Sequence, residues 1–307
     1  MKKILLTAAG TGTAFSYATA IAKNFPSIEV FTADINAAEY VTASLYSKKH
    51  FVVPLSTEPT YESTIKKIVE TEEIDFYLPL VDVDIERAHQ SDSLSSKLVA
   101  NNNIFCNACI EKDSYHSWAL GLQIKTPQLL KVDKLNNEDT VVLKKNGGFG
   151  SKDTEIVKVE TMAEVDLTDF SCYEYIHGEE YTVDCFPISS EVVTTVRKRV
   201  EVKNGVCVKA EITKNEELSN LALKLVSYFD LNHPFCFQVI KKNDDYYLID
   251  LNPRLGAGTA MGAATGKDYF SAHIAHILNL DIRKFLIENL NNCIITRQYS
   301  NYLMKVL

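Results

Sequence analysis

The sequence predicts an α/β fold at its N-terminal end and an α+β arrangement in the remainder of the chain. In about the first hundred residues, apolar strand segments alternate with helical ones. After about residue 105, most segments alternate apolar and polar residues in pairs joined by turns, as β-hairpins do. A chain of 307 residues is long enough for two or three domains, so the two patterns fit separate domains.

The N-terminal part has the pattern of repeated strand–helix–strand units. Short apolar runs predict the strands, and apolar residues at helical spacing predict the helices between them. This alternation favours a parallel sheet with helices on both faces. The predicted strands are residues 3–8, 29–33, 50–53 and 76–81, with helices at residues 15–23 and after Pro59.

The turn after the first predicted strand contains Gly10 and Gly12, which form part of a dinucleotide-binding fingerprint. That fingerprint needs a third glycine for close packing of helix and strand, and this chain has Phe15 there. Asp34 stands at a suitable sequence distance for a contact with a ribose. An NAD-dependent oxidoreductase is therefore one alternative, but Phe15 favours a structural or substrate-binding role for this region.

The rest of the chain is predicted to consist mainly of hairpins with three helices. The dipeptide before the strand that starts near Val206 is Asn-Gly, which is a strong signal for a two-residue turn. The predicted strands are residues 140–145, 154–159, 172–176, 181–186, 192–202 and 206–212, with a further hairpin over residues 235–252. The predicted helices are residues 111–122, 216–229 and 269–278.

Composition excludes several classes of function. The chain is 46% hydrophobic and 23% charged, as in soluble globular proteins. Its net charge of -8 argues against a nucleic-acid-binding surface. The apolar run after Lys3 is too short for a signal peptide, and no stretch reaches membrane-spanning length. We therefore expect a cytoplasmic protein with neither nucleic acid nor membrane as partner.

The cysteines do not form a zinc-binding pattern. Of seven cysteines, Cys106 and Cys109 form a lone CxxC pair with no second pair or histidines at ligand spacing. We expect all seven to be reduced and mostly buried thiols.

A predicted strand leads from Lys144 directly into a glycine-rich loop. The backbone N–H groups of such a loop can approach phosphate oxygens closely, and Lys144 would add a positive charge. The loop is not a Walker A motif, because no GK[ST] sequence opens a helix. An ordinary hairpin tip is the alternative. The residues of this candidate phosphate loop are Gly147, Gly148, Phe149, Gly150 and Ser151.

A second candidate site joins an apolar strand to an acidic turn. The backbone of Tyr173, Glu174, Tyr175 and Ile176 could contact an adenine edge, and the Glu180 carboxylate beyond the turn could hold ribose hydroxyls. Solvated acidic residues in an ordinary turn are the alternative.

The hairpin over residues 235–252 predicts a metal site. Phe237 and Val239 on the first strand are expected to pair with Ile249 and Leu251 on the second, which places these four apolar side chains on one face. A turn centred near Asp244 then sets Gln238 directly across from Asp250.

The opposite face of this hairpin carries oxygen-bearing side chains. Asp250 and Asn252 are two residues apart and share that face with Gln238. Such a set suits a hard cation that is shared with phosphates. Arg254 follows at once and could bind a phosphate through its guanidinium fork. Arg197 and Arg199 likewise share one face of a predicted strand, which is either solvated or brings Arg199 to a phosphate or substrate carboxylate.

The order of these sites resembles the ATP-grasp superfamily, nearest to its carbamoyl-phosphate-synthase-like branch. Lys112 matches the first ATP lysine of the family, and Lys144 with the glycine loop matches the second lysine and the flexible phosphate loop. Residues 173–176 match the adenine hinge, and Glu180 the ribose-binding glutamate. The metal ligands of the family match Gln238, Asp250 and Asn252, with aspartate where the family usually has glutamate, and Arg254 matches its phosphate arginine.

The resemblance implies a Rossmann-like pre-ATP-grasp domain over residues 1–105, an ATP-grasp N-terminal lobe over 106–178 and a C-terminal lobe over 179–307. It implies ATP and Mg2+ as cofactors, with Mn2+ as an alternative cation. It also implies ligation of a small carboxylate to an amine through an acyl phosphate, with Arg254 and Lys144 as catalytic residues; Arg199 is a third candidate from its strand position. An ATP-grasp-like binding module without ligase activity is the alternative, and homodimerisation stays open.

Overall fold

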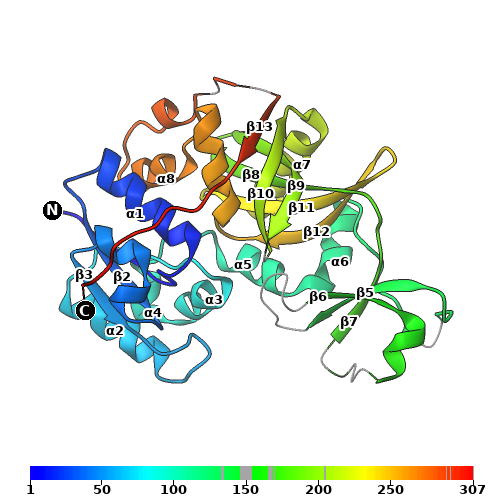
Figure 1. Cartoon of the computed structure of the whole chain (residues 1–307), viewed down its shortest axis with the longest axis horizontal. Coiled ribbons are helices and arrows are strands. Elements are labelled where there is room, and N and C mark those ends of the chain that lie inside the picture. Colours follow the sequence, from blue (N-terminus) through cyan, green and yellow to red (C-terminus); the bar gives the residue numbers. More distant parts are fainter. Residues whose placement is uncertain are drawn as a thin grey trace.

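The computed structural model describes residues 1–132, 135–145, 154–164, 168, 170–203, 205–287, 289–290 and 292–306. Three sheets organise these residues (Figure 1). A four-stranded sheet lies in the N-terminal part, a three-stranded sheet lies at the opposite end of the molecule, and a six-stranded sheet lies between them.

The N-terminal sheet is parallel, as the alternation of strands and helices predicts. Its order is β3-β2-β1-β4, with helices on both faces. One face packs on α1 and α8, and the other on α2, α3 and α4. The elements are β1 (Lys3–Leu6), α1 (Gly12–Asn24), β2 (Glu29–Asp34), η1 (Ala38–Tyr40), η2 (Thr42–Tyr46), β3 (Lys49–Val52), α2 (Tyr61–Thr71), β4 (Phe76–Leu78), α3 (Asp82–Gln90), α4 (Asp92–Ser95) and α8 (Tyr269–Ile277).

The predicted helix over residues 111–122 is wrong in its start and continuity. The chain instead forms α5 (Asn103–Ile110), a single 3-10 turn η3 (Lys112–Ser114) and α6 (Tyr115–Gly121). The Asn102 side chain caps α5 by accepting a hydrogen bond from the Phe105 N–H at 3.0 Å. Glu111 leaves the helical region with a ψ of 71°, which separates the two helices and places Lys112 in the turn between them.

The three-stranded sheet has the order β6-β5-β7 and is antiparallel. It consists of β5 (Thr140–Lys145), β6 (Thr154–Lys158) and β7 (Phe170–Glu174), and η6 (Val159–Glu164) follows β6. Val141 and Leu143 point into a small core with Met162 and Cys172. Because side chains alternate along a strand, Lys144 lies on the other face of β5.

The six-stranded sheet has the order β12-β11-β8-β9-β10-β13. Helices α5, α6 and α7 cover one face and bury an apolar core against it. The predicted helix over residues 216–229 is confirmed. The remaining elements are β8 (Glu179–Ile188), β9 (Glu191–Lys203), β10 (Val206–Thr213), α7 (Glu216–Phe229), β11 (Phe235–Lys242), β12 (Asp245–Asn252), η7 (Ala257–Thr265), η8 (Arg283–Phe285) and β13 (Cys293–Thr296).

The β11–β12 hairpin has the predicted pairing of Gln238 with Asp250, but Ile249 is not on the apolar face. The register runs from Gln238–Asp250 to Val239–Leu248, so Ile249 is the extra residue of a β-bulge. Leu248 therefore takes the core position expected for Ile249 and is fully buried. Strict alternation after Leu248 would turn Asp250 toward the core, and the bulge reverses this.

A buried histidine cluster joins α1, α8 and the segment before β11. The Tyr17 hydroxyl lies 2.6 Å from His273 Nδ1, and His273 Nε2 lies 3.1 Å from His233 Nδ1. Burial, together with the neighbouring His276, lowers the pKa of His233 to about 4. Burial, with His233 and His276 nearby, also lowers the pKa of His273 well below its ordinary value. The folded protein therefore holds these imidazoles neutral.

We expect acid to destabilise the protein through this cluster. Between about pH 6.5 and pH 4, imidazoles of the unfolded chain take up protons that the buried ones do not. The free energy of unfolding should therefore fall as pH falls, by roughly 3 kcal/mol at most for His233. Urea unfolding across this range measures the slope. His273→Gln should make the slope shallower, whereas His177→Gln, at an exposed turn, should not; equal slopes in all three proteins would contradict the assignment.

Candidate active site

A cleft of about 770 Å³ lies between the three-stranded and six-stranded sheets and extends to the N-terminal sheet. Both sheets contribute side chains from the faces opposite their apolar cores. The lining residues that bear on the sequence predictions are Lys112, Lys144, Tyr173, Glu174, Tyr175, Ile176, Glu180, Arg197, Arg199, Gln238, Asp250, Asn252 and Arg254.

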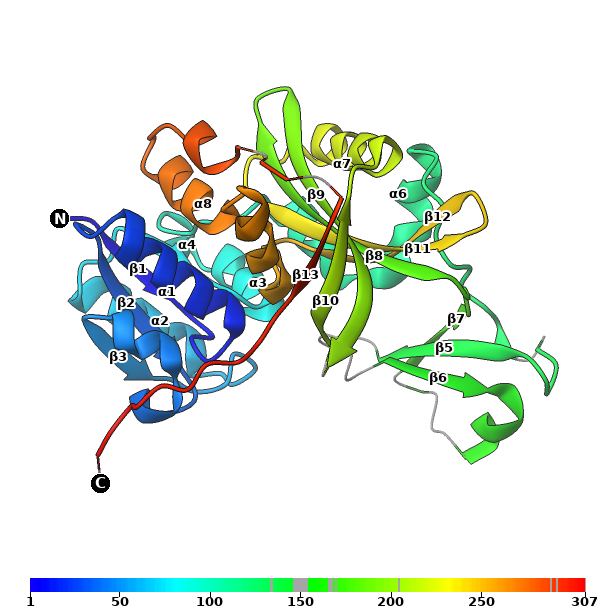
Figure 2. The ribbon, with the colours of Figure 1, turned by 45° about the horizontal axis from the view of Figure 1, so that its top comes forward.

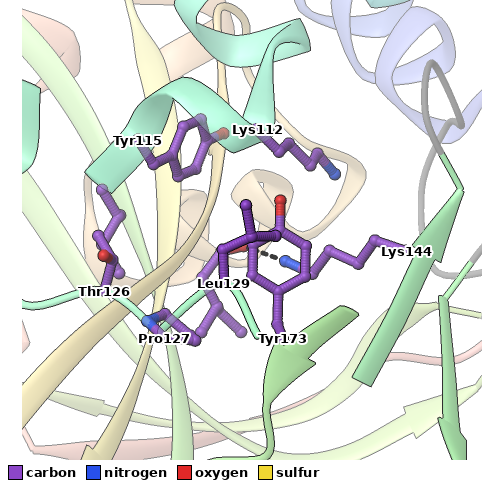
Figure 3. Close-up of a pocket in the computed structure, with 9 residues that line it drawn as sticks. Lys112, Tyr115, Thr126, Pro127, Leu129, Lys144 and Tyr173 are labelled. Atoms are coloured by element: carbon purple, nitrogen blue, oxygen red, sulfur yellow. Dashed lines mark hydrogen bonds between the residues drawn. The ribbon is translucent and has the colours of Figure 1, made fainter. Parts of the chain in front are cut away.

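Two lysines from different elements converge on β12. Lys112 comes from the η3 turn, and Lys144 reaches across from β5 over the Tyr173 ring (Figure 3). Lys112 Nζ lies 2.9 Å from Asp250 Oδ1. Lys144 Nζ donates a hydrogen bond to the Ile249 carbonyl at 2.7 Å. The bulge exposes this carbonyl to the cleft, so the same irregularity positions both Asp250 and the partner of Lys144.

Asp250 is a charged carboxylate in a confined place. Burial by itself raises the pKa of Asp250, but the nearby charges of Lys112 and Lys144 outweigh it, so the net pKa is below the ordinary value. Burial likewise lowers the pKa of Lys112, and Asp250 reverses this to a net increase. The site therefore holds two positive charges and one negative charge close together.

The three predicted metal ligands lie together on one face of the hairpin. Gln238 is paired with Asp250 across the two strands. Asn252 Nδ2 donates a hydrogen bond to Asp250 Oδ2 at 2.9 Å. Phe237, with full burial of its side chain, faces the core on the opposite side, as predicted.

The connector between β7 and β8 lines the side of the cleft. Tyr173 and Ile176 are buried, whereas Glu174 is partly exposed. Gly178 is required by close packing, because a Cβ there would lie 2.0 Å from the Lys241 carbonyl oxygen. The backbone of residues 173–176 is thereby held against β11. Burial raises the pKa of Glu180, beyond the connector, although the charge of Arg199 opposes the shift.

The three arginines of the cleft each face a carboxylate. Arg199 Nε lies 3.1 Å from Glu180 Oε1, and Arg254 Nε lies 2.9 Å from Asp82 Oδ1. Both contacts are ion pairs without the alignment of a hydrogen bond. The alternative of a solvated face for Arg197 and Arg199 is wrong, because only 2% of the Arg197 side chain is exposed and 6% of Arg199.

Arg197 forms a buried ion pair at the edge of the cleft. Its Nε and Nη2 donate hydrogen bonds to the two oxygens of Asp184 at 2.7 and 2.9 Å. The Thr259 hydroxyl donates a third to Asp184 at 2.6 Å. Two strands and the η7 segment are therefore joined through one carboxylate. Sequence reasoning did not identify Asp184, because its partner is visible only once β8 and β9 are paired.

The predicted phosphate loop lies outside the described residues. Its members are Gly147, Gly148, Phe149, Gly150 and Ser151.

The N-terminal sheet contributes cleft residues of which the sequence analysis singled out only Gly12. Thr11, Gly12 and Thr13 at the start of α1, with Leu80 and Val81 after β4, line the cleft. They follow β1 and β4, the neighbouring strands at which the sheet order reverses, and ligands of open α/β sheets bind at such a point. That signal requires the strand order, which the sequence alone does not contain.

The dinucleotide alternative is disfavoured by the partners of Asp34. Asp34 Oδ2 accepts a hydrogen bond from the Gly10 N–H at 2.7 Å, and Oδ1 accepts bonds from Asn36. The Asp34 carboxylate therefore stabilises the glycine turn. It points at the backbone that would bind a pyrophosphate rather than at a ribose.

The cysteines match the expectation of reduced thiols. All seven are free, and six are buried. Burial, together with the charge of Asp82, raises the pKa of Cys106 to about 12. Among the described residues, no group of three or more histidine, cysteine, aspartate or glutamate side chains could hold a metal ion. A cation at Asp250 would therefore have one carboxylate ligand and would depend on amide oxygens and on phosphate oxygens of a bound nucleotide for the rest of its coordination.

Two family models match the chain. Residues 4–96 match the PylC-like N-terminal domain, and residues 167–292 match a family described as ATP-grasp in the biosynthetic pathway with Ter operon. The chain contains an ATP-grasp domain. This finding confirms the predicted superfamily and fold class, whereas the carbamoyl-phosphate-synthase-like branch stays a prediction.

Solved structures share the fold at low sequence identity. N5-carboxyaminoimidazole ribonucleotide synthetase from Thermotoga maritima superposes with a TM-score of 0.71 at 16% identity, over 95% of this chain and 78% of that one. L-amino acid ligase from Bacillus licheniformis does so with a TM-score of 0.71 at 13% identity, over 94% and 78%.

A third similar structure contains a nucleotide and metal. It is the biotin carboxylase domain dimer of Hydrogenobacter thermophilus 2-oxoglutarate carboxylase, in complex with MgADP, ADP and bicarbonate. Its TM-score is 0.69 at 13% identity, over 93% of this chain and 69% of that one. No curated protein matches the sequence. None of the described helices has both the length and the apolarity needed to span a bilayer.

Proposed function

We propose that this ATP-grasp protein is an ATP-dependent ligase that activates a carboxylate as an acyl phosphate for attack by an amine or similar nucleophile. The observation that carries the proposal is the convergence of Lys112 and Lys144 on the Asp250 hairpin within one cleft between two sheets. Two cations beside a carboxylate suit a polyphosphate whose charge is partly neutralised by a metal ion.

The nucleotide is proposed to lie along the cleft between β5, β7 and β11. Lys112 and Lys144 would contact its phosphates, and the backbone of residues 173–176 its adenine. Glu180 would bind the ribose hydroxyls; its partly buried position supports a role other than a solvated turn acid. The sequence prediction that residues 147–151 bind the phosphates stays a proposal.

The donor set of the hairpin fits Mg2+, with Mn2+ as the alternative. Gln238, Asp250 and Asn252 offer oxygen atoms from one face, and Asp250 adds the single negative charge. One carboxylate is enough where phosphate oxygens and water complete the coordination of a hard cation. When bound, the metal would neutralise phosphate charge and hold the γ-phosphate for in-line attack.

The proposed chemistry needs positioning and charge rather than a side-chain nucleophile. A substrate carboxylate oxygen attacks the γ-phosphorus, the bond to the bridging oxygen breaks, and ADP leaves. An amine then attacks the acyl carbon and releases phosphate. Lys144, Arg254 and Arg199 line the cleft and would stabilise the transferred phosphoryl group and the substrate carboxylate.

The proposal also covers the substrates, the location and the domains of the protein. The substrates are proposed to be a small carboxylate and a small amine, and the protein to act in the cytoplasm. The proposed domains are residues 1–105, 106–178 and 179–307.

The products of the reaction test the proposal. Mg-ATP should raise the melting temperature, whereas NADH should not. Pairs of amino acids and small carboxylates, screened by mass spectrometry, should yield a ligated product with ADP and phosphate. Lys144→Ala should abolish product formation in the same assay, which separates this site from contaminating ATPases. AMP and pyrophosphate would instead indicate adenylation, and equal stabilisation by NADH would contradict the nucleotide assignment.

A binding module without ligase activity is the second candidate. It would bind Mg-ATP and give no product with any substrate pair in the screen. The presence of both lysines and all three metal-ligand candidates in one cleft argues against it.

A further inference from the structure

The last part of the described chain, residues 293–306, packs on the outside of two segments that line the cleft. Edge strand β13 pairs with β10, and the Arg297 N–H extends this ladder by donating a hydrogen bond to the Val208 carbonyl at 2.8 Å. The chain then leaves the sheet and runs to the N-terminal α/β region, passing α1 (Figures 1 and 2). We call residues 293–306 the C-terminal strap. It lies beyond the residues matched by either family model.

The strap holds one wall of the cleft through Arg297. Arg297 Nη1 donates a hydrogen bond to the Ala257 carbonyl at 2.9 Å. Ala257 begins η7, and together with Gly256 and Gly258 it lines the cleft. Burial, with the positive charge of Arg197 nearby, lowers the pKa of Arg297, so the two guanidinium groups lie close to the same segment.

Arg197 supports the same wall from inside. A Cβ on Gly258 would lie 2.4 Å from Arg197 Nη1, so glycine is required for the segment to pack directly on this guanidinium. The Thr259 hydroxyl bonds to Asp184, the partner of Arg197. Residues 256–259 are therefore held between Arg197 within the protein and Arg297 on the strap.

The strap also holds the facing wall, which is the start of α1. The Tyr302 ring lies 5.5 Å from the Phe15 ring, and Phe15 in turn packs on Tyr46 at 5.9 Å. Lys305 lies 4.0 Å from Glu39, which adds a weaker contact. Phe15 thus has a packing role at the position where a dinucleotide-binding turn has glycine.

The two walls meet at the N-terminal end of the cleft. A Cβ on Gly12 would lie 3.4 Å from the Ala257 Cβ, so the first turn of α1 and the start of η7 are neighbours. Both segments line the cleft, and α1 lies at the opposite side of the molecule from β5 and β7, which carry Lys144 and Tyr173 (Figure 1). We call this part of the cleft the substrate end, because the nucleotide is proposed to lie at the other. A single segment of chain is therefore attached to both sides of this opening.

We propose that the C-terminal strap positions the two walls of the substrate end of the cleft, with Arg297 as the positioning residue for residues 256–259 and Tyr302 for α1. Its effect on catalysis rests on the proposed function; its effect on the walls does not. Among the described residues, the strap forms its hydrogen bond to the cleft wall at Ala257 and its ring contact with α1 at Phe15. Loosening it should therefore affect the second substrate and spare the nucleotide.

Hydrogen exchange read by mass spectrometry tests the positioning directly. Arg297→Ala should raise the exchange rate of a peptide covering residues 256–265 by roughly tenfold, because the wall loses its outer hydrogen bond. Tyr302→Ala should raise exchange in residues 12–24 instead. Arg297→Lys, which keeps a donor, should restore most of the protection. Arg283→Ala, at an exposed arginine of η8, is the matched control and should change neither peptide.

Nucleotide binding and turnover distinguish a positioning role from a general loss of structure, because a general loss would weaken the binding of nucleotide and substrate alike. The dissociation constant of Mg-ADP should change less than about twofold in both strap variants, since they leave the nucleotide end intact. With a substrate pair from the product screen, KM for the carboxylate or the amine should rise about tenfold while KM for ATP stays within about twofold. The strap proposal would be overturned if exchange were unchanged in both peptides, or if the affinity for Mg-ADP fell as much as KM for the carboxylate or the amine rose.

The two proposals fail in different ways. If wild-type protein binds no Mg-ADP and forms no product, the proposed function fails, and the exchange experiment still decides whether the strap holds the walls. If wild-type protein is an active ligase and Arg297→Ala matches it in exchange and in every KM, only the strap proposal fails.

Discussion

Asp250→Asn is expected to lower turnover by about a hundredfold or more while the fold survives. Asparagine nearly preserves the shape and the hydrogen bond with Asn252, but removes the one negative charge that this hairpin contributes to cation binding. The pKa of Asp250 is held below its ordinary value by Lys112 and Lys144 against the effect of burial, so this charge is present at neutral pH. Saturating Mg2+ should restore only part of the activity.

The measurement is the rate of product formation at increasing Mg2+, together with circular dichroism and the shift in melting temperature caused by Mg-ATP. Asp245→Asn is the matched control, because Asp245 lies on the same strand and forms an ion pair with Lys125 at the exposed end of the hairpin. It should leave turnover unchanged. Full activity of Asp250→Asn, or an equal loss in both variants, would show that the hairpin is not the metal site.

The second large effect is expected on stability. Asp184→Asn should lower the free energy of unfolding by about 3–5 kcal/mol, because it leaves the Arg197 charge buried without its counter-charge. The side chains of Arg197 and Asp184 are 2% and 0% exposed. Burial by itself lowers the pKa of Arg197, and the Asp184 charge reverses this to a net increase, which indicates a charged pair. Urea unfolding at neutral pH measures the loss.

Glu179→Gln provides the control for this prediction. Glu179 pairs with Lys198 at 2.6 Å on the same two strands, but its side chain is 52% exposed. An exposed pair contributes at most about 1 kcal/mol, so the control should cost far less than Asp184→Asn. Similar losses for the two variants would mean that burial does not set the value of the Arg197–Asp184 pair. Because the Thr259 hydroxyl also bonds to Asp184, hydrogen exchange at residues 256–265 should rise in Asp184→Asn and not in Glu179→Gln.

Local patterns were sufficient for most of the fold. The alternation of buried side chains identified the hairpin that carries Gln238 and Asp250, because a one-residue slip would expose Phe237 and Leu251 to water. The amphipathic spacing of residues 216–229 identified α7, where Asn215 caps the first turn. The helix expected over residues 111–122 was wrong because the Asn102 cap starts α5 earlier, and a non-helical residue then separates α5 from α6.

The sequence by itself therefore predicted the superfamily, most of the strands and helices, and a set of candidate site residues. These depend on periodic burial and on residue types at short spacing, which a linear chain displays directly. Only the tertiary structure decided that Ile249 forms a bulge and leaves the core position to Leu248, that Lys112 pairs with Asp250, and that Arg197 is buried on Asp184. These features, like the strap that reaches Phe15, depend on packing between residues far apart in the chain. These contacts stabilise the protein only once the sheets have assembled, so the local preferences of single segments do not predict them.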